Sequence, residues 1–536
     1  MLRFYKLSAM AAVLLLMGSC KKYLDINSNP AVPQEAKAEF LLAPLVYQMA
    51  NGTSQDNRVI FKVTQDMIGS STETASTIWE RHGFPSASDV GGVIWRMTYV
   101  DMGLNLENMI NDGIANKKYE YAAIGYAMKA WAYQQTTDLH GPIILDEAFT
   151  QGMLSFPYHD QLEVYAKVRE WGALSLKYMN MKSPIDQSAK LNSVTGDNLY
   201  RGDMLKWKKF VYGIFALQYS HLINKPEFNA QYADSVIKYT DLSFSNSGDD
   251  ATVFFSATGD TDINPFGPYG TLNVSSSGFY YGVPTTNIVS YLTGRTRGDT
   301  LITDTSKYID PRLKRMLVPP AVTGMYAGAT PTKSALPAGV SPVFAGILTA
   351  GVTEMPGYYI FTENARYPIM SFAQLQFAKA EALFKKSNFA AAYESYKSGI
   401  RGHMNFINLY GRTTTGPQPP AISELEISRY LASSEVAQSA ADLKIADIMG
   451  QKYIAQWGWA GIEQWCDLRK YRYDANVYRN YYQLSATELV ADNAGKYANR
   501  FRPRYNSEYV WNEKELIKWG GLDKNYMTKE LWFSQP

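Results

Sequence analysis

The stretch at residues 371–400 constrains the fold more than any other part of this chain. It reads SFAQLQFAKAEALFKKSNFAAAYESYKSGI, with apolar residues at spacings of three and four on both sides of Ser387 and Asn388. This spacing predicts two amphipathic helices joined at that pair. Small and large side chains alternate along them in a fixed order, at Ala380, Leu383, Phe389, Ala392, Tyr396, Gly399 and Ile400. Small residues let two helices approach closely while larger rings fill the groove between them, so a tightly packed helical hairpin is predicted.

This order of residues is that of a tetratricopeptide hairpin. One such hairpin cannot bury its own apolar face, so further helix pairs should stack against it. Helical spacing recurs at residues 93–110, 119–137, 162–179, the later part of 197–222, and 441–470. Gly141 and Pro142 are a stop signal for the second of these helices, and residues 441–470 predict one last helix. The predicted fold class is therefore mainly α, with a tetratricopeptide-like scaffold of helical pairs at about residues 40–243 and 368–480.

The amino-acid composition changes between these two parts, at about residues 244–367. Gly, Pro, Ser and Thr crowd together, and helical spacing is lost except around residues 287–292. Long irregular segments inside compact domains are uncommon and are usually functional or disordered. Aromatic residues are interleaved throughout, which argues against simple disorder. This region predicts long irregular loops that have a function.

The beginning of the chain predicts where the protein resides. Basic residues precede an apolar run at residues 7–17, and Gly18 and Ser19 come directly before Cys20. This is the pattern of a secretory signal peptide, and the run is too short for a membrane span. Small-small-Cys after a leucine run resembles a bacterial lipobox, so we predict a signal peptide at residues 1–19 and a lipidated Cys20. The alternative is an accidental cysteine within an ordinary signal peptide.

Charge gives no support for nucleic acid as a partner. The formal net charge is +2, and Arg3 and Lys6 of the signal peptide account for both charges, since 2 − 2 = 0. A mature chain without a basic field does not predict binding to nucleic acid.

Motifs for catalysis or metal binding are missing from the sequence. It holds no H-E-x-x-H, paired-cysteine or EF-hand pattern, and no G-x-S-x-G, P-loop or dinucleotide turn. The sequence thus predicts no enzyme, no metal and no cofactor. A glycosidase needs only two carboxylates, a requirement that residue counting leaves open.

Cys466 and three neighbouring tryptophans lie together at residues 441–470. We interpret Cys466 as a small buried hydrophobe, with a reactive thiol as the alternative. Trp457, Trp459 and Trp465 are interpreted as core residues, with a ligand platform as the alternative.

Several stretches together resemble one family. These are YLDINSNPAVP after Cys20, TDLHGPIILDEAF, DNLYRGDMLKWKKF, SFAQLQFAKAEALF, QKYIAQWGWAGIEQWCDLRKYRY and the terminal RFRPRYNSEYVWN. In this order they resemble the SusD/RagB family, above all the SusD-like outer-membrane glycan-binding lipoproteins of Bacteroidetes. The resemblance implies a single SusD-like domain at residues 20–536, in which a tetratricopeptide-like scaffold carries long irregular ligand-binding loops. It implies no catalysis.

The same resemblance implies a place and a partner. The protein would be lipid-anchored in the outer membrane and face the cell surface. It would capture an oligosaccharide and act as the lid of a TonB-dependent SusC-like barrel, which imports the ligand. A lid for peptides or another nutrient, as among RagB-like relatives, and a glycan-acting enzyme stay open as alternatives.

Binding residues are sought where exposed aromatics accompany polar groups, because sugar rings pack C–H faces on aromatic rings and hydrogen-bond through their hydroxyls. One region is STETASTIWERHGFP, with Trp79 and Arg81. The other is the central loop region, where the candidates are Tyr269, Phe279, Tyr280, Tyr281 and Tyr326. For each aromatic, the alternative is a ring that pins its own loop to the scaffold.

Overall fold

The structure is a computed structural model. It describes residues 36–69, 74–84, 88–259, 262–267, 282–294, 310–318, 326–333, 343, 358–411 and 420–536. The predicted signal peptide, Cys20, Tyr269, Phe279, Tyr280 and Tyr281 lie outside the described residues, so those predictions stay untested.

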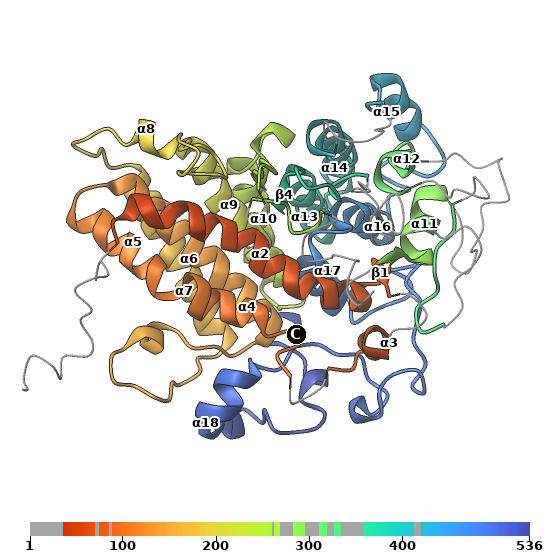
Figure 1. Ribbon diagram of the computed structural model, residues 1–536. Coiled ribbons are helices and arrows are strands. Elements are labelled where there is room, and N and C mark those ends of the chain that lie inside the picture. Colours follow the sequence, from red (N-terminus) through yellow and green to blue (C-terminus); the bar gives the residue numbers. More distant parts are fainter. Residues whose placement is uncertain are drawn as a thin grey trace, which may run out of the picture.

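Long helices stacked in pairs form the scaffold (Figure 1). They are α2 (Ala38–Thr64), α5 (Gly103–Ala115), α6 (Tyr119–His140), α7 (Gln161–Met179), α9 (Met204–His221), α10 (Ala233–Leu242), α13 (Phe372–Lys385), α14 (Phe389–Tyr410), α16 (Ile445–Gln456) and α17 (Gly461–Lys470). Helix α6 packs on α5 and α7, α9 on α10, and α13 on α14, while α13 also contacts α9, α10 and α16. This arrangement confirms a mainly α fold in which other helix pairs stack against the predicted hairpin.

The hairpin itself, α13 and α14, forms as predicted. Its turn lies at Ser387, whose φ is 59°, and the Asn388 side chain caps α14 by accepting from the backbone of Ala391. A Cβ at Gly399 would lie 2.7 Å from the ring of Phe377 on the other helix, so the close approach needs glycine there. Phe389 differs from the expected packing because 42% of it is exposed, although its ring contacts that of Phe384.

Short elements complete the fold. The helices are α3 (Thr74–Glu80), α4 (Val93–Arg96), α8 (Ser188–Leu191), α11 (Thr286–Thr293), α12 (Leu313–Met316), α15 (Glu424–Leu431) and α18 (Glu513–Lys518). Single π-helical or 3₁₀ turns lie at Met97–Met102, Asp146–Phe149, Phe228–Tyr232, Ser247–Asp249, Ala491–Asn493, Tyr505–Tyr509, Tyr526–Thr528 and Trp532–Ser534.

Two small antiparallel sheets frame the loop-rich region. Strand β2 (Ala251–Val253) pairs with β4 (Tyr367–Met370), so the two ends of that region are joined to each other. Strand β1 (Met67–Ile68) pairs with β3 (Val283–Pro284), which ties the loops to the end of α2. The loop-rich region is therefore joined to the scaffold at both ends by β2 and β4, and again in between by β3.

The single helix predicted at residues 441–470 is wrong. The chain leaves the helix at Trp457 and turns at Gly458, whose φ is 81°, so α16 and α17 are separate helices. Asp66 holds this break: its carboxylate accepts from the Gly458 backbone at 2.8 Å, and its carbonyl accepts from the Trp457 indole at 3.0 Å. Helix α18 also follows, so α17 is not the last helix.

One hydrophobic core runs through the scaffold. Trp457, Trp459 and Trp465 are all buried in it, which confirms their interpretation as core residues. Cys466 is buried beside them, and burial raises the pKa of its thiol well above its usual value. This agrees with a packed hydrophobe. Among the described residues, no helix is both long enough and apolar enough to span a membrane.

Candidate functional site

The two candidate residues at the end of α3, Trp79 and Arg81, lie in different environments. Trp79 is only 2% exposed and belongs to the main core, which matches the alternative of a ring that pins its segment. Arg81 is half-buried at the surface, where its Nε donates to the Glu488 carbonyl at 2.7 Å. In return, the Arg81 carbonyl accepts from the Val490 backbone at 3.1 Å. Arg81 therefore fixes the segment after α17 against the end of α3.

The central loop region meets α3 at the same place. The backbone of Thr332 donates to the Glu80 carboxylate at 2.8 Å, and the other oxygen of that carboxylate accepts from Gly69 at 3.3 Å. Thr332 has a φ of 63°, a left-handed conformation that is a genuine outlier for a β-branched residue. Such strain gathers at functional sites, where the surrounding structure enforces it. The two regions selected from the sequence are thus joined directly.

At this junction, one carboxylate collects several donors. Glu488 Oε1 accepts from Lys333 Nζ at 2.8 Å, from the Tyr482 hydroxyl at 2.8 Å and from the Thr332 hydroxyl at 3.3 Å. Lys333 also lies over the Tyr482 ring, 5.6 Å from its centroid. We call Thr332, Lys333, Tyr482 and Glu488 the Glu488 cluster. It presents a ring, a cation, a hydroxyl and a carboxylate side by side at the surface.

The electrostatics keep this cluster ionised. The Lys333 and Glu488 side chains are 51% and 20% exposed, so water reaches both. Partial burial would raise the pKa of Glu488, but hydrogen bonds from Lys333, the Ser485 backbone and Tyr482 lower it to about 2. Hydrogen bonds to Glu488 and Tyr482 raise the pKa of Lys333. Both groups are charged at neutral pH and can exchange hydrogen bonds with a polar ligand.

A cavity of about 290 Å³ opens beside the same segment. Ile78 and Val490 line one part of it, and Arg502, Asp492 and Lys524 supply polar groups. Arg502 is 8% exposed, and its Nε has no hydrogen-bond partner among the described residues. A buried donor without a partner costs free energy, so this cavity suits a ligand or water with an acceptor oxygen.

The remaining described candidate, Tyr326, lies six residues before Thr332. It is half-buried and packs against the main core. Burial raises the pKa of its phenol to about 12, with a smaller contribution from Tyr358. Tyr326 thus supports the loop that carries Thr332 and keeps part of its ring exposed.

Sequence reasoning missed Lys333, Tyr482 and Glu488. The tail after α17 is rich in Arg and Tyr, and that composition was the one signal for Tyr482. Nothing local marks Glu488, which lies 155 residues from Lys333 in sequence. Only the tertiary fold brings these side chains together.

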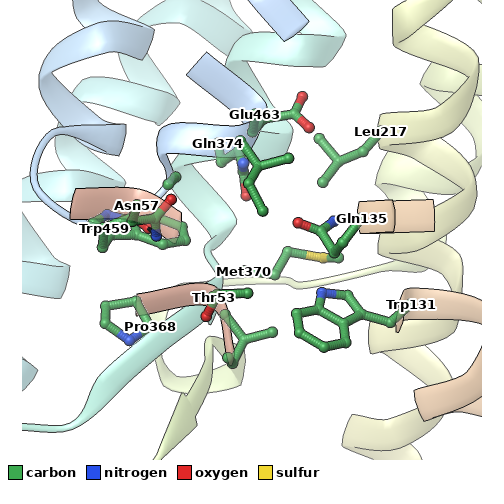
Figure 2. A pocket seen from close by; sticks show the side chains of 13 residues that line it. Thr53, Asn57, Trp131, Gln135, Leu217, Pro368, Met370, Gln374, Trp459 and Glu463 are labelled. Atoms are coloured by element: carbon green, nitrogen blue, oxygen red, sulfur yellow. Dashed lines mark hydrogen bonds between the residues drawn. The ribbon is translucent and has the colours of Figure 1, made fainter. Parts of the chain in front are cut away.

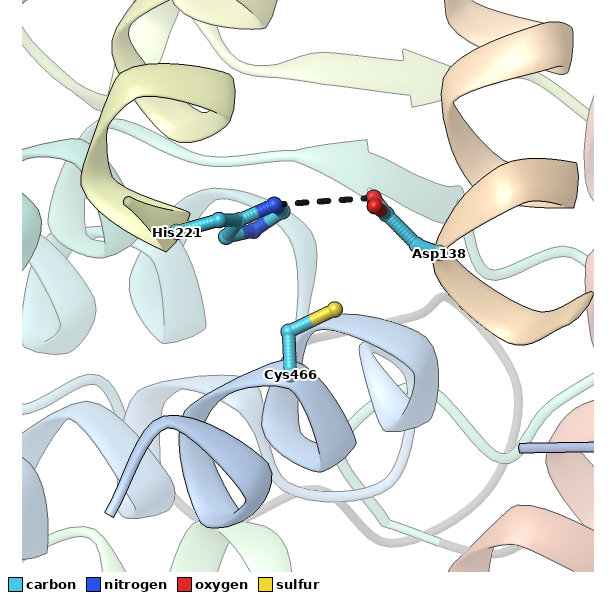
Figure 3. Close-up of side chains that lie close together, drawn as sticks. All are labelled: Asp138, His221 and Cys466. Carbon is cyan, nitrogen blue, oxygen red and sulfur yellow. Dashed lines mark ion pairs between the residues drawn. The ribbon is translucent and has the colours of Figure 1, made fainter. Parts of the chain in front are cut away.

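A second group of chemically active side chains is buried in the scaffold, where Asp138, His221 and Cys466 lie together (Figure 3). Their potential metal-ligating atoms are within 4.8 Å of one another. Each is already engaged: Asp138 accepts from the Tyr165 hydroxyl at 2.6 Å, and Cys466 Sγ accepts from the Arg469 guanidinium at 3.1 Å. Burial and the nearby Asp138 carboxylate raise the pKa of Cys466 well above its usual value, despite the opposing charge of Arg469. The thiol therefore stays protonated and is a poor metal ligand, because metals bind the thiolate.

His221 instead links two carboxylates in the core. Its Nε2 lies 2.9 Å from Glu463 and its Nδ1 lies 3.6 Å from Asp138. Burial alone would lower the pKa of His221, but the Glu463 and Asp138 charges raise it. Burial alone would raise the pKa of Glu463, but His221 and nearby Lys452 lower it to about 2. The group forms a structural charge network between α6, α9 and α17.

Between β4 and these same helices lies a small cavity of about 40 Å³ (Figure 2). Trp131, Gln135 and Met370 point into it, with Asn57 and Trp459 on the opposite side. A water occupies about 30 Å³ in the liquid, so this space holds one or two waters and no sugar. It is a packing gap of the scaffold.

The fold defines a class of protein: a mainly α scaffold of stacked helix pairs with long irregular loops. Residues 30–489 match the SusD-like family, which is described as starch-binding and associating with the outer membrane. The chain therefore belongs to the SusD-like family, as its sequence motifs indicated.

Solved structures agree on the fold. A SusD homologue from Bacteroides fragilis has a TM-score of 0.69 at 16% identity, and the match covers 93% of this chain and 100% of that one. A SusD/RagB family protein from Bacteroides thetaiotaomicron has a TM-score of 0.64 at 18% identity, covering 93% and 99%. A chitin-binding protein has a TM-score of 0.65 at 17% identity, covering 93% and 100%. No curated protein matches the chain.

Proposed function

We propose that this chain is a lipid-anchored, surface-facing outer-membrane protein that captures an oligosaccharide and delivers it to a TonB-dependent SusC-like barrel as its lid. Membership of a family described as starch-binding and associated with the outer membrane supports this role. The lipobox-like sequence at Cys20 supports the anchor. The protein itself carries out no reaction on the ligand.

The Glu488 cluster is the observation that carries the proposal. It offers the Tyr482 ring to the C–H face of a sugar, and Lys333 and Glu488 to its hydroxyls. Glu488 lies two residues before Val490, which lines the cavity of about 290 Å³, so a chain of sugars bound at the cluster can extend toward that cavity. The aromatic residues predicted from the central loop region, Tyr269, Phe279, Tyr280, Tyr281 and Tyr326, remain proposed as further ligand contacts.

Isothermal titration of the detergent-solubilised mature protein with malto- and chito-oligosaccharides tests the site. Tyr482→Ala should weaken binding by about tenfold or more, the loss expected for a central aromatic contact. Lys518→Ala is a matched control, because Lys518 lies 5.7 Å from the centroid of the Trp519 ring and pairs with Glu515 at 3.0 Å elsewhere on the surface. Equal affinities for the wild type, Tyr482→Ala and Lys333→Ala would refute the site.

The role is tested separately. If the protein binds peptide pools but no glycan, its ligand is a peptide and not an oligosaccharide. Release of shorter sugars on incubation with a glycan would indicate an enzyme. Palmitate labelling that is lost in Cys20→Ser, and co-purification with a TonB-dependent barrel, test the anchor and the partner. Trp79→Ala is a poor probe of contact, because the buried ring supports the fold.

A further inference from the structure

Another cavity borders residues 479–480, just before Tyr482 in sequence. It measures about 270 Å³ and lies among α11, α14, α15, α16 and residues 479–480. Three tyrosine rings, two amide side chains and a serine contribute to its wall: Tyr291, Tyr396, Tyr430, Gln451, Asn480 and Ser290. At about 30 Å³ per water, the space exceeds what a few ordered waters fill.

The base of this cavity is rigid. Gln451 donates to the Tyr430 hydroxyl at 3.0 Å and accepts from Arg312 at 2.6 Å. Arg312 is fully buried and forms an ion pair with Asp310 at 2.6 Å. Because these groups are fixed before any ligand arrives, little conformational entropy is lost on binding.

Three charged side chains lie among the described lining residues, namely Glu435, Asp447 and Arg479. Arg479 is the only basic residue among the described lining residues, and it contacts Asp447 at 2.6 Å. Asp447 also accepts from the Lys444 backbone at 2.9 Å, which caps α16. A cavity with tyrosine rings, amides and no unpaired cation suits a neutral polyhydroxylated molecule better than an anion.

One residue that lines the cavity has a hydroxyl without a partner. Ser290 is 1% exposed, and its hydroxyl has no hydrogen-bond partner among the described residues. The neighbouring Tyr291 hydroxyl interacts with the Asn480 backbone, and the Tyr291 ring packs against Gly450, where an added Cβ would lie 2.7 Å away, and against the Tyr453 ring. Buried hydroxyls are normally satisfied, so the Ser290 hydroxyl at this cavity indicates a missing polar ligand.

We propose that this cavity is a second binding site, which takes one neutral sugar residue. The ligand class rests on the proposed glycan-binding function, whereas the cavity and the unsatisfied Ser290 hydroxyl are independent of that function. The sugar would stack on a tyrosine ring and receive hydrogen bonds from Ser290, Tyr291 and Asn480. The site is separate from the Glu488 cluster and could hold the end of a glycan or a released monosaccharide.

Saturation-transfer NMR with glucose, N-acetylglucosamine and glucuronate tests this site. At least one neutral sugar should bind, and glucuronate should bind more weakly. Ser290→Ala should weaken that binding about 2- to 10-fold, the effect of one hydrogen bond, while thermal stability stays equal or rises because an unsatisfied group is removed. Ala446→Leu should abolish binding by filling the cavity, since Ala446 lines it.

Thr293→Val is the matched control. Thr293 lies on the same helix, does not line the cavity, and donates to the Val289 carbonyl at 2.7 Å. It should leave sugar binding unchanged. Maltoheptaose or chitohexaose binding that persists without any monosaccharide binding would overturn the second site and leave the proposed function standing. Monosaccharide binding that Ser290→Ala and Ala446→Leu do not alter would also overturn it, and a protein that binds none of these sugars would overturn both proposals.

Discussion

Lys470→Met should destabilise this protein strongly, because Lys470 is a buried charge with two buried partners. Its ammonium lies 3.0 Å from Glu381 and 2.8 Å from Asp467, and all three side chains are buried. Removing one member of a buried ion pair costs about 3–5 kcal/mol, since the remaining charge is left uncompensated. Glu381 keeps its hydrogen bond from Tyr471 and Asp467 keeps its pair with Lys452. We therefore expect the lower end of that range, about 3 kcal/mol.

Urea unfolding followed by tryptophan fluorescence and circular dichroism measures this loss as a lower midpoint. Arg472→Met, two residues further on, is the control: Arg472 and Glu530 form an exposed pair, 55% and 34% exposed, worth about 1 kcal/mol at most. Adding Glu381→Met to Lys470→Met should recover part of the loss, because the unpaired carboxylate is removed. The reasoning is refuted if Lys470→Met shifts the midpoint no further than Arg472→Met.

Three further predictions follow from single groups. Gly458→Ala should lower the free energy of unfolding, measured with urea, by about 1–3 kcal/mol, and by more than Gly152→Ala does. Both glycines have a φ of 81°, but only at Gly458 would an added Cβ meet neighbouring atoms. Burial would lower the pKa of His221, but its two carboxylate partners raise that pKa above 6.5. The protonated His221 therefore stabilises the fold fully below about pH 6.5, and this stabilisation is lost as the pH rises through the raised pKa. Urea midpoints across pH should show this loss, and His221→Gln should flatten it. The pKa of Glu488 falls from 4.5 to about 2, so its pair with Lys333 is lost only as the pH approaches 2, and oligosaccharide affinity measured at pH 7 and pH 5 should be equal.

The scaffold could be predicted from the sequence because its signals are local. Apolar spacing and small residues specified α13 and α14 to within a few residues, and Gly141 marked the end of α6. The break between α16 and α17 could not be predicted in the same way. Gly458 alone is a weak signal within a helical pattern, and the break is fixed by Asp66, which lies 392 residues away.

The candidate site illustrates the same limit more strongly. Trp79 and Arg81 lie two residues apart, and the sequence predicts both equally as ligand contacts. In the structure, the Trp79 ring is buried in the core, whereas the Arg81 side chain hydrogen-bonds the segment around Glu488 at the surface. Local sequence cannot separate them, because which side of a short helix is buried depends on what packs against it. Here the partner is the segment around Glu488, supplied by the far end of the chain. The Glu488 cluster forms only once α3, the central loops and that segment have docked on the scaffold. Ligand affinity should therefore depend on how stably these segments are docked. A variant that loosens their docking should weaken binding even though the substituted residue does not contact the ligand.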